Sequence, residues 1–280
     1  MEMYCDLHTH SYYSDGTCSP AELIDGAEKL GLGAVALTDH NTVAGLPNFL
    51  AAAEGSGVEP VAGIEISTDY DNVELHILAL FVKPADYDPI TKLMEEMVRR
   101  KEEANVALVK ALNRAGYSVN LDAIKAGTPN GQINRAHIAA ELTRLGYVND
   151  IQAAFKKLLS PKHGLYVPPK RIESYEAIRF IKALGCTAVL AHPFLNLDAA
   201  SLRNFLPCAV KCGLDGMEVA YSKYSPDTTA LAKEIADAFG LKYSGGSDFH
   251  GGNKPDIAIG RGRGDLAILM DWLEKLRPGG

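Results

Sequence analysis

Short apolar runs alternate with helical patterns over the first part of the chain. The run 34–37 (Ala-Val-Ala-Leu) has the length and apolar content of a buried strand. The segment that starts at Ser19 combines an N-cap, a proline at the first helical position and a glutamate three residues after the cap, which is a helix start. The pattern predicts strands over 4–7, 34–37, 61–66 and 74–82, and helices over 20–30 and 43–54.

The middle of the chain changes to a purely helical period. It predicts a long helix over 89–113 and shorter helices over 121–126, 135–145 and 151–159, and no strand signal falls between 83 and 163. The strand and helix alternation then resumes. It predicts helices over 174–184, 202–212, 226–239 and 266–276, and strands over 186–191, 217–220 and 242–244.

Alternating strands and helices on both sides of a helical block are typical of a parallel α/β barrel that an all-helical segment interrupts. We therefore expect residues 1–85 and 173–280 to form the barrel. Residues 86–172 are expected to form a helical insertion or lid domain.

Composition narrows the function classes. The formal net charge of −7 argues against a general nucleic-acid or membrane-surface binder. No apolar run approaches the length of a membrane span, and the first residues lack the basic and apolar regions of a signal peptide. An odd number of scattered cysteines, five in all, is typical of free thiols. These features predict a cytoplasmic protein with no membrane contact, and nothing in them indicates an obligate protein partner.

Histidines and carboxylates collect where the predicted strands end. They are His8 and His10 after the first strand, Asp39 and His40 after the second, Glu65 in the third, His192 after the strand 186–191, and Asp248 and His250 after the strand 242–244. The carboxyl ends of barrel strands form one rim, where such folds build their active sites. Imidazole and carboxylate together are ligands for a metal cluster.

His76 requires a separate argument. Too few residues separate the strand that ends near Ile66 from the strand that contains His76 for a parallel crossover. We expect an antiparallel hairpin that turns at 69–72 and places His76 directly opposite Glu65. Asp15, in a loop, is either a turn residue or a side chain that folds over the same rim.

These residues carry a resemblance to the polymerase and histidinol phosphatase (PHP) family. The matching segments are Asp6-Leu7-His8-Thr9-His10, Leu37-Thr38-Asp39-His40, Gly63-Ile64-Glu65, Leu75-His76-Ile77, Ala191-His192-Pro193 and Gly246-Ser247-Asp248-Phe249-His250. The resemblance implies a distorted seven-stranded barrel with a trinuclear metal site.

The resemblance also implies a ligand set. One ion would use His8, His10, Glu65 and Asp248, a second Asp15, His40 and His250, and a third Glu65, His76 and His192. Asp39 would orient one of the metal ligands without binding an ion itself, although direct coordination of an ion by Asp39 stays open. Two or three ions of Mn, Fe or Zn would activate a water as hydroxide, with Asp15, His40, Glu65 and His250 as the catalytic ligands.

The helical block resembles the branch of the family that hydrolyses nucleotide phosphates, through the pair Arg135-x-His137. That likeness implies a phosphate-binding role for Arg135 and His137, with Lys170 as a further candidate. Solvated surface positions remain the alternative for all three.

The expected function is hydrolysis of phosphate monoesters of small nucleotides, such as AMP or a nucleoside 3′,5′-bisphosphate. A 5′-3′ exonuclease acting on short RNA is the close alternative. A histidinol-phosphate-type phosphatase and a noncatalytic, metal-stabilised domain are further alternatives.

Overall fold

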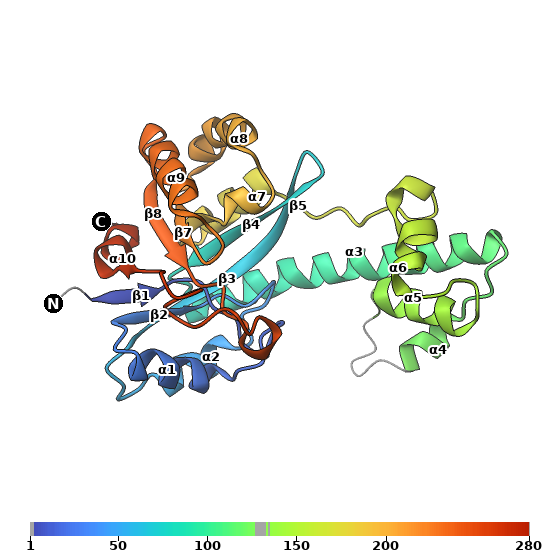
Figure 1. The fold of residues 1–280 in the computed structure, drawn as a ribbon, viewed down its shortest axis with the longest axis horizontal. Helices are drawn as coiled ribbons and strands as arrows, with labels where there is room; N and C mark the ends of the chain where they lie inside the picture. Colours follow the sequence, from blue (N-terminus) through green and yellow to red (C-terminus); the bar gives the residue numbers. More distant parts are fainter. Residues whose placement is uncertain (1–2, 127–132, 134, 280) are drawn as a thin grey trace. The chain divides into compact units, whose positions relative to one another are not determined.

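The computed structural model describes residues 3–126, 133 and 135–279. The chain divides into two compact units (Figure 1). One unit consists of Met1–Lys92 and Ile172–Gly280, and the other of Leu93–Arg171. The first boundary falls within the long helix α3 (Tyr87–Arg114).

The first unit is built on one sheet with the strand order β8-β7-β6-β4-β3-β2-β1-β9, and β5 pairs with β3 beside this path. The strands are β1 (Tyr4–Asp6), β2 (Ala34–Leu37), β3 (Glu59–Tyr70), β4 (Val73–Leu80), β5 (Ile172–Glu173), β6 (Thr187–Ala191), β7 (Gly216–Tyr221), β8 (Lys242–Gly246) and β9 (Ile268–Leu269).

The two sides of this sheet come back together beyond the end of β1. The Leu7 N–H donates to the Gly245 carbonyl over 3.3 Å, and Thr9 forms a parallel bridge with Phe249. The sheet is therefore nearly closed and barrel-like. The chain forms an α/β fold, as its strand and helix alternation predicts.

Two details differ from the expected parallel, seven-stranded barrel. Within the described residues the sheet has nine strands, and β4 runs antiparallel to β6 as well as to its expected hairpin partner β3. The additional strands β5 and β9 are two residues long each, which is too short to leave a periodic signal. The expected helix over 266–276 consequently begins only at Met270, because Ile268 and Leu269 pair with β1.

The hairpin between β3 and β4 confirms the antiparallel prediction and corrects its register. Asp71 and Asn72 form a two-residue turn, and both have positive φ, as a type I′ hairpin turn requires. Ser67, rather than Glu65, therefore lies opposite His76. The turn centre is one residue later than expected, which moves the register by two residues. His76 stays on the expected face because side chains alternate with a period of two.

Helices surround the sheet. They are α1 (Pro20–Lys29), α2 (Leu46–Ala52), α7 (Ser174–Ala183), α8 (Ala199–Cys212), α9 (Pro226–Ala238) and α10 (Met270–Leu276). Figure 1 shows α1 and α2 below the sheet in this view and α8 and α9 above it. The predicted capping box of α1 is present, with the Ser19 N–H donating to Glu22 Oε2 over 2.7 Å and the Glu22 N–H donating to Ser19 Oγ over 3.1 Å. Short 3₁₀ turns occupy Pro84–Asp86, Pro161–His163, Pro193–Leu195 and Gly251–Asn253.

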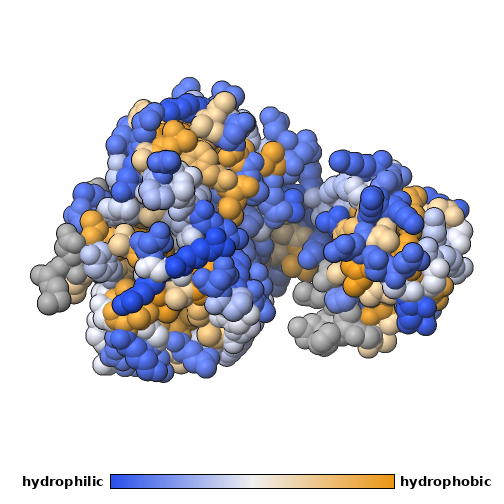
Figure 2. All heavy atoms as spheres, viewed as in Figure 1, coloured by the Kyte–Doolittle hydropathy of each residue, from blue (hydrophilic) through white to orange (hydrophobic). Residues whose placement is uncertain are grey.

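The second unit has its own apolar core. It contains most of α3 together with α4 (Leu121–Ala126), α5 (Arg135–Arg144) and α6 (Ile151–Ala154), which continues as a π-helix over Phe155–Leu159. Leu112, Ile138 and Leu142 are completely buried within it. Figure 2 shows hydrophilic residues over much of the visible face of each unit, with hydrophobic patches between them. Across the described residues, no helix has both the length and the apolar character needed to span a membrane.

Candidate metal centre

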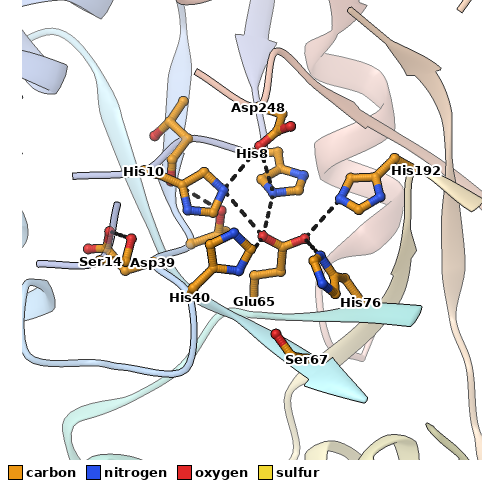
Figure 3. A network of polar contacts seen from close by, with 12 residues as sticks. His8, His10, Ser14, Asp39, His40, Glu65, Ser67, His76, His192 and Asp248 are labelled. Atoms are coloured by element: carbon orange, nitrogen blue, oxygen red, sulfur yellow. Dashed lines mark hydrogen bonds and ion pairs between the residues drawn. The ribbon is translucent and has the colours of Figure 1, made fainter. Parts of the chain in front are cut away.

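The buried carboxylate of Glu65, on β3, lies at the centre of a cluster of imidazoles (Figure 3). The shortest distances are 3.1 Å from Oε2 to His8 Nε2, 3.3 Å from Oε2 to His10 Nε2, 3.1 Å from Oε2 to His40 Nδ1, 2.7 Å from Oε1 to His76 Nδ1 and 2.9 Å from Oε1 to His192 Nε2. Strands distant in sequence thus bring these side chains to one point, as the strand-end pattern predicts.

Backbone pairing explains why the strand ends converge. His8 and His10 follow β1 at alternate positions, and both are completely buried. His40 follows β2 and forms a parallel bridge with Glu65, which holds the two residues side by side. The segment after β8 runs beside the segment after β1, because the Asp248 N–H donates to the His8 carbonyl over 2.8 Å.

A second group forms around the exposed Asp15. Its Oδ1 lies 3.2 Å from His250 Nε2 and 3.8 Å from His10 Nδ1, and its Oδ2 lies 3.9 Å from His40 Nε2. Nδ1 of His250 lies 2.8 Å from the Asp248 carbonyl, which leaves Nε2 facing Asp15. Asp15 therefore folds over the rim, and the turn-only interpretation does not describe its position.

The two carboxylate oxygens of Asp248 have different neighbours. Oδ1 lies 3.2 Å from His10 Nε2 and 3.7 Å from His8 Nε2. Oδ2 accepts a hydrogen bond from the Tyr221 hydroxyl over 2.8 Å and another from Lys254 Nζ over 2.7 Å. Oδ1 is therefore the oxygen available on the side of the imidazoles.

Unpaired polar atoms test whether this cluster suits a cation. His8 Nε2, His10 Nδ1 and Nε2, and Glu65 Oε2 are buried and have no hydrogen-bond partner among the described residues. Leaving such atoms unpaired costs about 1–3 kcal/mol each. One ligand atom from each of His8, His10 and Glu65 lies within 4.8 Å of the others, and the donor set of imidazole and carboxylate fits divalent metal ions.

Burial and neighbouring charges both shift the pKa values of the residues in the cluster. Burial opposes ionisation of Glu65, but the imidazoles of His8 and His76 hold its pKa well below the usual range. Burial lowers the pKa of His40 to about 4, which keeps this imidazole neutral and ready to act as a ligand. Burial also works against charge on His76, yet Glu65 raises the pKa of His76 to about 10. Without a metal ion, His76 therefore carries a proton that a metal would displace.

Asp39 acts on the loop that carries Asp15. Its Oδ1 accepts from the Ser11 N–H over 2.8 Å and from Ser14 Oγ over 2.6 Å, and its Oδ2 accepts from Ser11 Oγ over 2.6 Å. The loop shape between the first strand and the first helix therefore depends on this carboxylate.

Sequence reasoning missed several groups around the cluster. Glu218 on β7 and Asp6 on β1 are completely buried, and Tyr221 and Lys254 hold Asp248. Asp6 accepts backbone N–H bonds from Ser247 and Gly260, each within 2.8 Å, and so ties the segment before Asp248 to β1. A single carboxylate inside an apolar strand, as in Met217-Glu218-Val219, is the sequence signal that could have revealed Glu218.

The predicted phosphate-binding residues all belong to the helical unit. The Arg135 guanidinium lies 4.4 Å from the centre of the Tyr166 ring and 5.5 Å from that of Phe155. His137 is half-buried on α5, and Lys170 is exposed. Their role in binding phosphate stays a prediction.

Comparison with known proteins agrees with this geometry. The PHP domain family model matches residues 6–166. A 5′-3′ exoribonuclease of Haemophilus influenzae is 34% identical over 246 residues, which cover 88% of this chain and 89% of that protein. A 3′,5′-nucleoside bisphosphate phosphatase of Chromobacterium violaceum is 32% identical over 275 residues, which cover 98% of this chain and 94% of that protein.

A solved structure shares the whole fold. The crystal structure of a Bifidobacterium adolescentis protein assigned as a metal-dependent phosphoesterase has a TM-score of 0.71 and 29% identity, and the match covers 98% of this chain and 95% of that one. The family model spans more than half of the chain, and the curated relatives align along most of it. The chain therefore belongs to the PHP domain family and is a metal-dependent phosphoesterase, a hydrolase.

Proposed function

We propose that this protein hydrolyses a phosphate monoester of a small nucleotide, such as AMP or a nucleoside 3′,5′-bisphosphate. The observation that carries the proposal is the convergence of buried, unpaired donor atoms around Glu65 in a chain that aligns with a nucleoside bisphosphate phosphatase over 98% of its length.

The geometry supports two or three ion positions. His8, His10 and Glu65 converge on one position, with Asp248 Oδ1 beside them. Asp15, His40 and His250 surround a second, together with His10. His76 and His192 face Glu65 Oε1 at a third. Divalent ions bound there would supply an activated water and positive charge for the phosphoryl oxygens.

The chain's own residues keep this site ordered. Glu65 is completely buried. Its Oε2 lies beside the His8 imidazole and its Oε1 beside the His76 imidazole, so the carboxylate holds the two rings at fixed separations. Asp15 is the exposed member of the set, so it marks the side from which a phosphate ester reaches the ligands. We further propose that Arg135, His137 and Lys170 bind a substrate phosphate, and that residues 86–172 are an insertion in a PHP barrel.

Product analysis tests the proposal. The protein is incubated with Mn²⁺ and AMP, adenosine 3′,5′-bisphosphate or a short 5′-phosphorylated RNA, and products are separated by chromatography. Glu65→Gln, prepared in parallel, controls for contaminating phosphatases. Release of phosphate from the small nucleotides, with the RNA left intact, is the expected result.

A second candidate is 5′-3′ exonuclease activity on short RNA. The relative that favours it is the exoribonuclease, which is 34% identical to this chain. Stepwise shortening of the RNA without phosphate release from the small nucleotides would replace the first proposal with this one. Inactivity on all three substrates would exclude both.

A further inference from the structure

The carboxylate of Glu218 connects two members of the cluster that come from different strands. Glu218 lies on β7 and is completely buried. Its Oε1 lies 2.9 Å from His8 Nδ1, and its Oε2 accepts the backbone N–H of His192 over 2.7 Å. One carboxylate therefore spans the residues that follow β1 and β6.

The contact with His8 determines which ring nitrogen carries the proton. A neutral imidazole has one N–H, and a carboxylate can only accept a hydrogen bond. Glu218 therefore favours the proton on His8 Nδ1. The opposite nitrogen, Nε2, points toward Glu65 and has no hydrogen-bond partner in the described part of the chain. That arrangement leaves a lone pair on Nε2 for a metal ion.

The contact with His192 holds an unusual backbone conformation. His192 has φ 29° and ψ 54°, in the left-handed region that a residue with a side chain rarely adopts. The hydrogen bond from its N–H to Glu218 stabilises this turn, which directs Nε2 to within 2.9 Å of Glu65 Oε1. The rings of His8 and His192 stack at 5.5 Å with an interplanar angle of 21°.

We propose that Glu218 is a positioning residue that fixes the tautomer of His8 and the orientation of His192, and so sets the affinity of two adjacent metal positions. The inference rests on the proposed metal centre and adds Glu218 as a residue that contacts two of the proposed ligands. Partners of this kind typically change metal affinity about 10–100-fold when they are replaced.

The isosteric substitution Glu218→Gln separates positioning from packing. If the amide oxygen accepts the His192 N–H, the NH₂ group faces His8 Nδ1, which must become an acceptor. The His8 proton then moves to Nε2, where it blocks the metal. If the amide is reversed, its NH₂ group opposes the His192 N–H instead. Either orientation loses one of the two functions while the side-chain volume stays the same.

The first measurement is Zn²⁺ binding, by calorimetry on metal-free protein and by metal content after dialysis. We expect Glu218→Gln to lose about 10–100-fold in affinity at one or two positions. Glu218→Asp, which keeps the carboxylate, should recover part of that loss. Glu234→Gln, an exposed glutamate paired with Arg203, is the matched control and should bind as the wild type does. Wild-type affinity in Glu218→Gln would overturn the proposal.

The second measurement distinguishes positioning from direct coordination. In a crystal structure of the Zn²⁺-loaded protein, each Glu218 oxygen should keep its N–H partner and lie beyond bonding distance of any ion. A zinc–oxygen distance of about 2.0–2.2 Å would make Glu218 a ligand and overturn the positioning role. Neither measurement requires turnover. A wild-type protein that binds Zn²⁺ but hydrolyses no nucleotide would reject the proposed function and leave the Glu218 inference intact.

Discussion

Nδ1 of His76 lies 2.7 Å from Oε1 of Glu65, although the two residues are diagonal rather than opposite across the β3–β4 hairpin. Diagonal neighbours on one face of an antiparallel pair remain within reach of long side chains. Both carboxylate oxygens of Glu65 therefore have imidazole neighbours, Oε1 on the side of His76 and Oε2 on the side of His8.

Replacing Glu65 by glutamine should remove the charge that the ions require while keeping the side-chain volume. We expect bound metal to fall and Mn²⁺-dependent phosphate release to become undetectable, since the proposed ligand set uses Glu65 at two ion positions. Metal content by plasma mass spectrometry and turnover check this. Glu59→Gln, at the first residue of the same strand and paired with Arg277, is the control. Full metal content in Glu65→Gln would contradict the assignment.

Metal binding should release protons and strengthen with pH. The pKa of His76 is raised to about 10 by Glu65, so at pH 8 the metal-free protein holds a proton there that a ligand cannot keep. Calorimetry at pH 8 in buffers of different ionisation enthalpy should show proton release, and less of it in His76→Gln. Equal release by the two proteins would exclude His76 as the source.

The same shift predicts how the metal-free protein responds to base. A folded-state pKa above the unfolded value contributes stability that is complete below about pH 6.5 and is lost as pH rises through about 10. The free energy of unfolding in EDTA should therefore fall between pH 7 and pH 10, and fall less in His76→Gln. Urea unfolding at pH 7, 8.5 and 10 measures it.

Asp39→Asn should loosen the loop that carries Asp15 without touching the group around Glu65. The carboxylate accepts hydrogen bonds from Ser11 and Ser14, and an amide loses one of its two acceptor oxygens. We expect weaker occupancy of the position near Asp15 and His250, with the other positions retained. Titration of metal content shows this as the loss of one ion, whereas unchanged stoichiometry would argue against the coupling.

Arg135→Met tests the phosphate-binding prediction while keeping an apolar stem near Tyr166 and Phe155. If Arg135 holds a substrate phosphate, KM for the nucleotide should rise roughly tenfold or more, and kcat should change less, because a charge-assisted hydrogen bond contributes about 1.5–3 kcal/mol. Arg144→Met, on the same helix and paired with Glu141, is the matched control. Equal KM values for both variants would assign Arg135 to packing alone.

Much of the site could be predicted because its residues follow strand ends. The apolar run of β2 marks where Asp39 and His40 leave the sheet, and the helix start at Ser19 marks where the loop with Asp15 must end. Barrel topology then brings distant strand ends to one rim. The hairpin could be predicted from its short spacing.

The rest depends on contacts that pattern does not encode. The register of His76 is set by positive φ angles at Asp71 and Asn72, and a turn centre displaced by one residue cannot be read from apolar spacing. Glu218 contacts the cluster from within β7, where a single charged residue only interrupts the apolar pattern that predicts a strand. Strands as short as β5 and β9 exist only because a neighbouring strand offers hydrogen bonds.

The bridge between Thr9 and Phe249 also bears on how the protein acquires its metal during synthesis. The ribosome delivers His8 and His10 about 240 residues before Asp248 and His250. A nascent chain that has not reached Asp248 therefore has only part of the proposed ligands and no closed rim to retain an ion. Stable metallation should follow closure of this rim, and the ion acquired is then set by the metals available to the folded site.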